Sequence, residues 1–239
     1  MTEPAPPHRQ PEEGHRHGRL SARATVVAQP APPGTTPLAD PSGGRPGLRH
    51  VPPGAGPYRL VVLLHGAGGS ARQGLDLLLP LADAHRLLLV APQAAASTWD
   101  LIAEGYGPDV ARIDTLLADA LGTYPVAGVT FGGFSDGASY ALSLGLTNGD
   151  LVDAVLAFSP GFAAPLVTHG RPRVFVSHGT DDRVLPVDVC SRRLVPRLHT
   201  LGYPAEYAEF TGGHEVPEEI RRRAVDWLVA EPGVSAPAR

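Results

Sequence analysis

The sequence has few or no residues of several types, and these shortages exclude internal disulfides and lysine-dependent catalysis. Its 239 residues include one cysteine, Cys190, so no disulfide can form within the chain. Burial and hydrogen bonding must therefore hold the fold, as in proteins of reducing compartments. Lysine is absent, and all 20 basic residues other than histidine are arginine. A lysine nucleophile or Schiff base is thereby excluded, together with the enzyme classes that depend on one.

Long hydrophobic runs are also missing. No segment reaches the eighteen or so apolar residues that cross a bilayer, and the N-terminus has no apolar segment of signal-peptide type. We therefore expect a cytoplasmic protein without integral membrane association. The formal net charge of -4 gives no general attraction to nucleic acid. A small-molecule or polymer substrate is expected instead of a nucleic-acid partner, and the oligomeric state is left open.

Composition divides the chain into three parts. Residues 1–46 are rich in proline and glycine and poor in apolar periodicity, which predicts a largely disordered N-terminal tail. Within it, residues 22–28 are compatible with a short edge strand. Residues 47–232 have the apolar content of one folded domain, and residues 233–239 form a short C-terminal tail.

From Tyr58 onward, apolar runs of strand length alternate with segments of helical periodicity. Alternation of this kind predicts an α/β fold, in which a mostly parallel sheet is covered by helices on both faces. Active groups in such sheets gather at the carboxyl ends of the strands. Strands are expected at 60–64, 87–90, 126–131, 152–158, 173–178 and 206–210, and helices at 72–85 (interrupted at Pro80), 109–121, 139–146, 187–201 and 218–229.

The strand expected at 126–131 is followed by Gly133-Phe134-Ser135-Asp136-Gly137, a G-x-S-x-G motif. Glycines at these positions allow a steep turn from strand to helix that exposes the serine hydroxyl. Free N–H groups at the start of the helix favour negative charge on a tetrahedral intermediate. Ser135 is therefore the candidate nucleophile, although an ordinary glycine-lined turn would give the same pattern.

A serine hydroxyl needs a base to take its proton, preferably a histidine on a late loop after a strand. His214 meets this description, since it follows the last expected strand within Gly212-Gly213-His214-Glu215. The third group should be a carboxylate after the strand that ends at His178. Asp181 and Asp182 stand side by side there, and turn geometry alone does not choose between them.

Two backbone donors are needed to stabilise the oxyanion that forms during acyl transfer. The N–H of Asp136, directly after the nucleophile, is one candidate. The other is the N–H of Ala67, in the glycine-rich loop after the first strong strand. No Lys follows this loop, so a phosphate-binding G-x-x-x-x-G-K-[ST] motif is absent from it.

Four segments occur in a characteristic order, and together they resemble the phospholipase/carboxylesterase family of α/β-hydrolases. They are the His-Gly loop at 64–69, the serine motif at 133–138, the aspartate segment at 178–186 and the histidine segment at 213–217. The resemblance spans roughly residues 48–228. It implies an α/β-hydrolase fold whose members are small carboxylesterases, lysophospholipases and acyl-protein thioesterases.

The resemblance also implies particular roles and an absence of cofactors. It selects Asp182 as the catalytic aspartate, leaves Asp181 as the fallback, and implies neither a metal ion nor an organic cofactor. The sequence departs from the family at Asp136, where the family usually has glutamine. A carboxylate beside the nucleophile opposes anionic intermediates unless it is paired, so neutral substrates are favoured.

Only a short Pro/Gly-rich loop connects Phe158 to Arg173, where many lipases insert a helical lid. An open site is therefore expected, with His65, Gly66, Trp99 and Tyr106 as candidate substrate contacts, although both aromatic residues suit the core equally well. We expect a serine carboxylic-ester hydrolase for short-to-medium or aryl esters. The alternatives are an acyl-thioesterase or lysophospholipase, a polyester or feruloyl-type esterase, and a non-catalytic binding protein.

Overall fold

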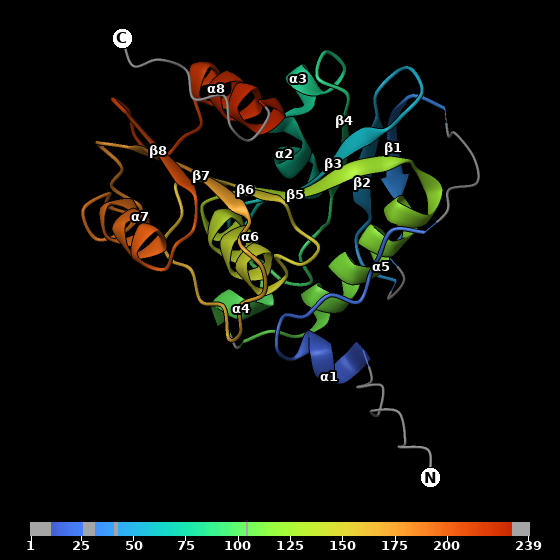
Figure 1. Ribbon diagram of the computed structural model, residues 1–239, viewed down its shortest axis with the longest axis horizontal. Helices are drawn as coiled ribbons and strands as arrows, with labels where there is room; N and C mark the ends of the chain where they lie inside the picture. The colour runs from blue at the N-terminus through green and yellow to red at the C-terminus, as the bar shows by residue number, and fades with distance from the viewer. Residues whose placement is uncertain (1–10, 26–31, 41–42, 104, 231–239) are drawn as a thin grey trace.

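The computed structural model describes residues 11–25, 32–40, 43–103 and 105–230, and within them eight strands form one open sheet (Figure 1). The strand order is β1-β2-β4-β3-β5-β6-β7-β8. Strands β3 to β8 run parallel where they pair, while β2 pairs antiparallel with both β1 and β4. The strands are β1 Gly34–Leu38, β2 Gly47–Val51, β3 Tyr58–Leu64, β4 Leu87–Ala91, β5 Val126–Phe134, β6 Ala154–Phe158, β7 Arg173–Gly179 and β8 Ala205–Phe210.

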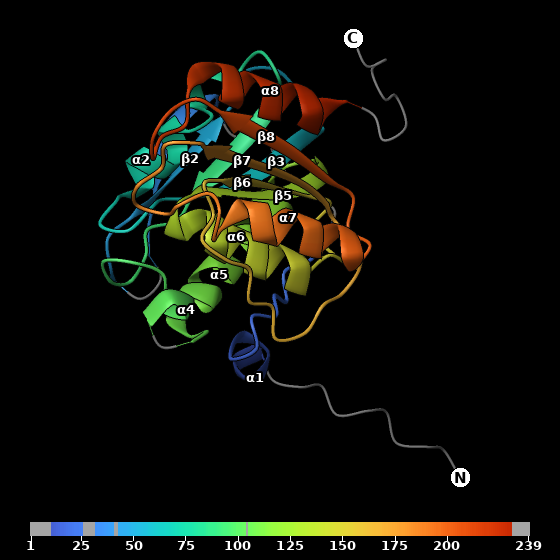
Figure 2. The same cartoon turned by 90° about the vertical axis from the view of Figure 1, so that its left-hand side faces the viewer.

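Helices cover both faces of this sheet. Figures 1 and 2 show α2, α3 and α8 on one face and α5, α6 and α7 on the other, where α1 and α4 also lie. The described helices are α1 Pro11–His15, α2 Ala71–Asp76, α3 Leu79–Ala82, α4 Asp100–Ala103, α5 Pro108–Thr123, α6 Asp136–Thr147, α7 Ser191–Thr200 and α8 Glu218–Val229. The expected fold class, an α/β protein with helices on both faces, is confirmed.

Two hydrophobic cores lie on opposite sides of the sheet, because successive side chains of a strand point to opposite faces. In β3, Val61 and Leu63 belong to the core beneath α2 and α8. Leu60, Val62 and Leu64 belong to the core beneath α5 and α6. All five side chains are essentially inaccessible to solvent, which explains why this strand reads as a continuous apolar run.

The strand registers align the carboxyl ends of the central strands. Leu64 of β3 lies opposite Gly133 of β5, and Phe134 of β5 lies opposite Phe158 of β6. The loops that follow β3, β5 and β6 therefore leave the sheet at the same edge. This edge carries the candidate site.

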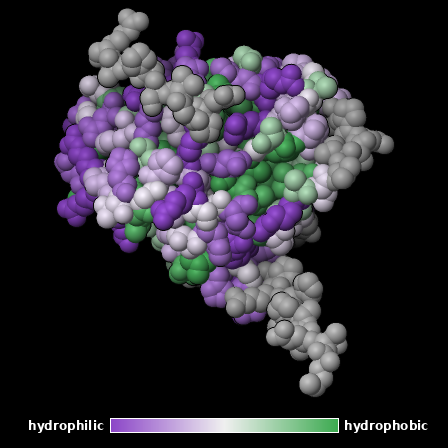
Figure 3. Space-filling view, in the orientation of Figure 1, coloured by the Kyte–Doolittle hydropathy of each residue, from purple (hydrophilic) through white to green (hydrophobic). Residues whose placement is uncertain are grey.

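The face of the molecule shown in Figure 3 is mainly polar. Hydrophilic side chains cover most of it, with a large hydrophobic area to the right of the centre and a smaller one near the lower edge. In the part of the chain that is described, no helix combines the length and hydrophobicity of a bilayer-spanning segment.

The structure differs from the sequence prediction mainly before residue 58. The expected helix at 218–229 coincides with α8, and the expected helix at 72–85 divides into α2 and α3 before Pro80. Strand β1 was not expected, because its sequence Gly-Thr-Thr-Pro-Leu is polar and contains proline. Proline is tolerated here because β1 is an edge strand, where one N–H needs no partner.

The N-terminal segment is also more ordered than its composition suggests. Asp114 of α5 accepts hydrogen bonds from the Ser21 and Ala22 N–H groups, from the Ser21 hydroxyl and from His15 Nε2, all at 2.6–3.0 Å. Leu20 and Ala22 are buried in the core. Within residues 1–46, where the composition predicted a largely disordered tail, the structure thus describes α1, β1 and the buried Leu20 and Ala22. No strand occupies residues 22–25, and residues 26–28 lie outside the described part.

Replacing Asp114 with alanine is expected to lower the free energy of unfolding by about 3 kcal/mol, because the donors of Ser21 and Ala22 lose their acceptor. Burial alone would raise the pKa of Asp114, but hydrogen bonds from Ser21 and His15 outweigh it and lower the pKa below its ordinary value. The stabilisation is thus fully present above the ordinary carboxyl pKa and is lost as pH falls through the lowered one.

Denaturant unfolding of Asp114→Ala beside Asp119→Ala tests this anchor. Asp119 is an exposed aspartate on the same helix and pairs only with Arg49 at the surface, so its replacement should have little effect. Equal stability of the two variants at neutral pH would show that the N-terminal segment contributes nothing to the fold.

Candidate active site

Ser135 lies in the sharp turn between β5 and α6. Its backbone has φ 58° and ψ -122°, a conformation that residues with a side chain rarely adopt. The Ser135 N–H donates to Phe158 O at 2.9 Å, which fixes the turn against β6. A Cβ on Gly137 would lie 2.2 Å from Leu64 O, so glycine is required for α6 to approach β3 so closely. The strained turn holds the Ser135 side chain within hydrogen-bond distance of His214.

Three predicted site residues meet at this turn. The Ser135 hydroxyl donates to His214 Nε2 at 2.8 Å, and His214 Nδ1–H donates to Asp182 Oδ2 at 2.6 Å. Each residue comes from a different loop: Ser135 follows β5, Asp182 follows β7 and His214 follows β8. The arrangement can draw a proton from the serine hydroxyl and stabilise the charge that then appears on the imidazole.

The carboxylate of Asp182 is held in place by further donors. Its Oδ1 accepts from the Val184 and Leu185 N–H groups, each at 2.9 Å, and its side chain is inaccessible to solvent. Burial alone would raise its pKa, but hydrogen bonds from His214 and from Leu185 N–H outweigh it and lower the pKa below its ordinary value. Asp182 therefore remains ionised beside His214 near neutral pH.

The structure also distinguishes the two neighbouring aspartates. Asp181 is exposed, and its N–H donates to Gly212 O, whereas Asp182 contacts the imidazole of His214. This geometry agrees with the choice that the family resemblance implied.

His178 supports the aspartate from the end of β7. It is fully buried, and its Nδ1 lies 2.7 Å from Ser191 Oγ. Its Nε2 lies 2.7 Å from Leu185 O and 3.3 Å from Asp182 Oδ2, so Nε2–H is directed at both oxygens. Burial lowers the pKa of His178, which favours a neutral ring. The sequence indicated a structural role for His178 at the end of a strand, but it did not signal this contact with Asp182.

The two expected oxyanion donors come from the loop after β3 and from the residue that follows Ser135. Ala67 is exposed in the loop after β3, and Asp136 is the first residue of α6. The adjoining Gly66 packs against the nucleophile, since a Cβ built on it would lie 3.4 Å from Ser135 Cβ. Neither the Ala67 N–H nor the Asp136 N–H has an acceptor among the described residues. Both donors are thus free to bind an oxyanion.

The partner of the Asp136 carboxylate among the described residues is a neutral hydroxyl and not a cation. The Thr98 hydroxyl donates to Asp136 Oδ2 at 2.7 Å. This contact directs the carboxylate toward the loop after β4. Thr98 was not singled out in the sequence, because no motif surrounds it.

His65, a candidate substrate contact from the sequence, occupies a buried position in which both ring nitrogens are hydrogen-bonded. Its side chain is buried, Nδ1–H donates to Gly66 O at 2.8 Å, and Nε2 accepts from Ala94 N–H and from the Gln93 amide. Burial is the main reason that its pKa is lowered, so the ring is neutral. With both ring nitrogens engaged, His65 shapes the loop that carries Ala67.

The two aromatic candidates are packing residues as well. Trp99 is fully buried, stacks on Tyr140 with ring centroids 5.3 Å apart, and donates its indole N–H to His65 O at 2.8 Å. Tyr106 is buried and its ring lies directly beside Gly18 of the N-terminal segment. This packing favours the core interpretation of Trp99 and Tyr106, which the sequence left open beside the substrate-pocket one.

Solved structures with a similar fold include several hydrolases. Esterase PE8 is 27% identical over 81% of this chain and 95% of its own, with a TM-score of 0.58. A phospholipase/carboxylesterase from Dyadobacter fermentans is 19% identical over 87% of this chain and 100% of its own, also with a TM-score of 0.58. Acyl-protein thioesterase 2 from Zea mays is 20% identical over 76% of this chain and 97% of its own, with a TM-score of 0.57.

These likenesses show that the chain has the α/β-hydrolase fold of serine esterases, as its motifs predicted. No protein-family model matches the chain, and no curated protein matches it by sequence.

Proposed function

We propose that the chain is a serine carboxylic-ester hydrolase that works through an acyl-enzyme. The observation that carries the proposal is the continuous hydrogen-bonded arrangement of Ser135, His214 and Asp182. It is supported by two unpaired N–H groups beside the serine and by the esterases that share the fold.

In the acylation step, His214 Nε2 takes the proton of Ser135 as Oγ attacks the ester carbonyl. The N–H groups of Ala67 and Asp136 stabilise the oxyanion of the tetrahedral intermediate. The C–O bond to the alcohol then breaks, and the leaving oxygen receives the proton held by His214. Asp182 keeps the imidazole oriented and offsets its positive charge.

Deacylation repeats these steps with water as the nucleophile. His214 takes a proton from water as the water oxygen attacks the acyl carbonyl, and returns that proton to Ser135 Oγ as the carboxylic acid leaves. The groups already described complete the cycle, and the resemblance implies no metal ion or organic cofactor. Neutral esters suit this site best, because Asp136 adds a negative charge near the nucleophile.

An open, lidless cleft is supported by the segment between β6 and β7, since residues 159–172 contain neither a helix nor a named strand. Gly161 N–H donates to Ser139 Oγ at 2.9 Å, which ties this segment to the first turn of α6. Phe162 is exposed on this segment, and Val184 is exposed on the segment that follows β7. These apolar side chains can contact a short or medium acyl chain without a lid.

We expect the highest kcat/KM for p-nitrophenyl acetate and butyrate, lower values for octanoate, and little hydrolysis of palmitate. The physical reason is that exposed apolar side chains such as Phe162 and Val184 cover a short acyl chain but leave most of a long one in contact with water. Initial rates with purified protein over the four chain lengths measure this preference. A maximum at palmitate would contradict the short-to-medium assignment, and hydrolysis of none of the esters would favour a non-catalytic binding protein.

An acyl-thioesterase or lysophospholipase is the second candidate, because the same fold is found in a Zea mays acyl-protein thioesterase. The same groups would act on either bond. Rates on butyryl thioesters, lysophospholipid and p-nitrophenyl butyrate in one assay series separate the two. Polyester and feruloyl esters belong to the same series, because an open cleft admits them.

A further inference from the structure

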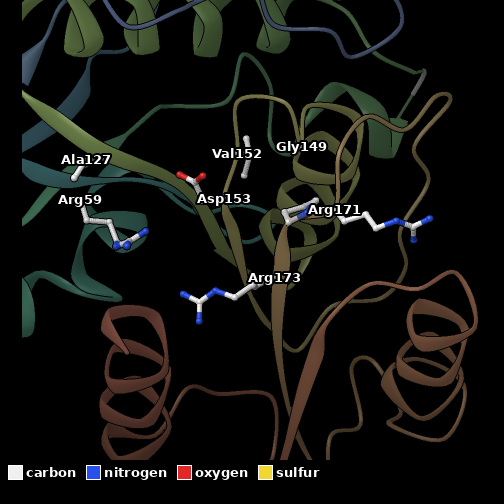
Figure 4. A pocket seen from close by; sticks show the side chains of 8 residues that line it. Arg59, Ala127, Gly149, Val152, Asp153, Arg171 and Arg173 are labelled. Carbon is white, nitrogen blue, oxygen red and sulfur yellow. The ribbon is translucent and has the colours of Figure 1, made fainter. Parts of the chain in front are cut away.

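A second cleft lies at the opposite edge of the sheet from Ser135. It has a volume of about 360 Å³ and is lined by residues at the amino ends of β3, β5, β6 and β7 (Figure 4). Ala127 of this cleft precedes Ser135 by eight residues of extended chain, which places the two roughly 26 Å apart. A ligand in this cleft would therefore not be a substrate of Ser135.

Arginines dominate the charged lining. Arg59 is the second residue of β3, Arg173 is the first residue of β7, and Arg171 lies two residues before Arg173. Asp153 is the one carboxylate among the lining residues. Figure 4 shows the side chains of Arg59 and Arg173 on the same side of the cleft, while Arg171 points away from them. Two guanidinium groups therefore face one region of the cleft.

Arg173 is fixed by contacts at the end of α8. Its guanidinium donates to Trp227 O at 3.4 Å and to Leu228 O at 3.0 Å, and lies 4.6 Å from the centre of the Trp227 ring. Burial, followed by the neighbouring charge of Arg59, lowers the pKa of Arg173. These contacts use two of its five N–H donors and leave the others for a ligand.

Arg59 has no such contacts. Within the described residues its side chain makes no hydrogen bond and no ion pair. Its Nη1 and Asp153 Oδ2 both lie near Gly128, 3.0 Å and 2.8 Å from the position of a Cβ built there. Asp153 Oδ2 already accepts from Val129 N–H at 2.8 Å, which leaves Oδ1 to accept from another donor.

We propose that this cleft binds a small phosphate monoester that carries hydroxyl groups, such as a sugar phosphate. Arg59 and Arg173 bind the phosphate oxygens, and Asp153 Oδ1 accepts from a hydroxyl of the organic part.

The chemistry of the cleft selects this ligand class. A phosphate monoester carries a charge of about -1.5 to -2 near neutral pH, which two guanidinium groups balance. Guanidinium groups also match phosphate oxygens geometrically through paired N–H donors. A carboxylate repels a phosphate but accepts from a hydroxyl, so Asp153 favours a ligand that has both groups. A volume of about 360 Å³ lies within the range of small-molecule sites and exceeds what a bare phosphate fills.

Isothermal titration calorimetry at constant ionic strength tests the proposal with glucose 6-phosphate, inorganic phosphate and glucose as probes. Saturable binding of glucose 6-phosphate is expected, about tenfold or more tighter than that of inorganic phosphate, with none for glucose. Arg59→Gln should weaken glucose 6-phosphate binding by about tenfold or more. Arg197→Gln, an exposed arginine on α7, makes the same change of charge elsewhere and should have no effect.

Two further variants keep the test decisive. Arg59→Lys retains the charge but not the fork of donors, so its binding should be intermediate. Asp153→Asn should reduce the preference for glucose 6-phosphate over inorganic phosphate, because it removes the repulsion and weakens the acceptor. Thermal unfolding and hydrolysis of p-nitrophenyl butyrate confirm that each variant is folded.

Three results would overturn the proposal. They are no saturable binding of glucose 6-phosphate, equal binding by the folded Arg59→Gln variant, and equal affinity for inorganic phosphate, which would assign the cleft to the free ion.

Discussion

Replacing Ser135 with alanine is expected to reduce kcat for p-nitrophenyl butyrate on the order of 10⁶-fold, because no other group near His214 can form the acyl-enzyme. The fold should be unaffected. Alanine has the same Cβ as serine at φ 58°, and the turn is held by the Ser135 backbone N–H, which the substitution preserves. Initial rates, together with the thermal unfolding temperature, measure both parts of the prediction.

A matched control removes a hydroxyl far from the site. Thr115 is exposed on α5 and donates only to Ala111 O, so Thr115→Ala should hydrolyse the ester at the wild-type rate. If Ser135→Ala kept more than about one per cent of wild-type kcat with an unchanged unfolding temperature, Ser135 would not be the nucleophile.

Replacing Asp182 with asparagine is expected to lower kcat about 10⁴-fold, whereas Asp181→Asn should change it less than about threefold. The Asn oxygen can continue to accept from Val184 and Leu185, so the amide NH₂ would take the place of Oδ2. That group donates to His214 Nδ1 and leaves the proton on Nε2, which then cannot accept the proton of Ser135.

The two aspartates form an internal control, since they are adjacent and the substitutions are identical. Steady-state kinetics of the two variants on p-nitrophenyl butyrate decide between them. A larger loss in Asp181→Asn would contradict the assignment, and equal losses in both variants would indicate a general effect on the loop after β7.

The sequence predicted those parts of the fold and site that depend on local patterns. Ser135 and His214 were found because glycines mark the turn after β5 and the loop after β8, and because strands alternate with helices. Asp182 was different, since two adjacent aspartates fit the same loop and only a family resemblance separated them. Burial and the donors of Val184 and Leu185 now provide a physical distinction.

Long-range contacts explain what the sequence did not predict. The N-terminal segment is polar and proline-rich, yet Asp114 on α5, about 90 residues later, holds Ser21 and Ala22. Thr98 and His178 have no local motif, and their roles depend on the positions of Asp136 and Asp182 in space. The sequence left Trp99 open between pocket and core because an aromatic side chain on a loop suits either, and its burial favours the core.

Labelling with a fluorophosphonate, followed by peptide mass spectrometry, tests the central claim most directly, because the reagent phosphonylates only an activated serine. We expect one modified residue, Ser135, with labelling lost in Ser135→Ala and strongly slowed in His214→Ala. Loss of ester hydrolysis should follow the extent of labelling. Modification of another serine, or full inactivation without modification of Ser135, would contradict the account.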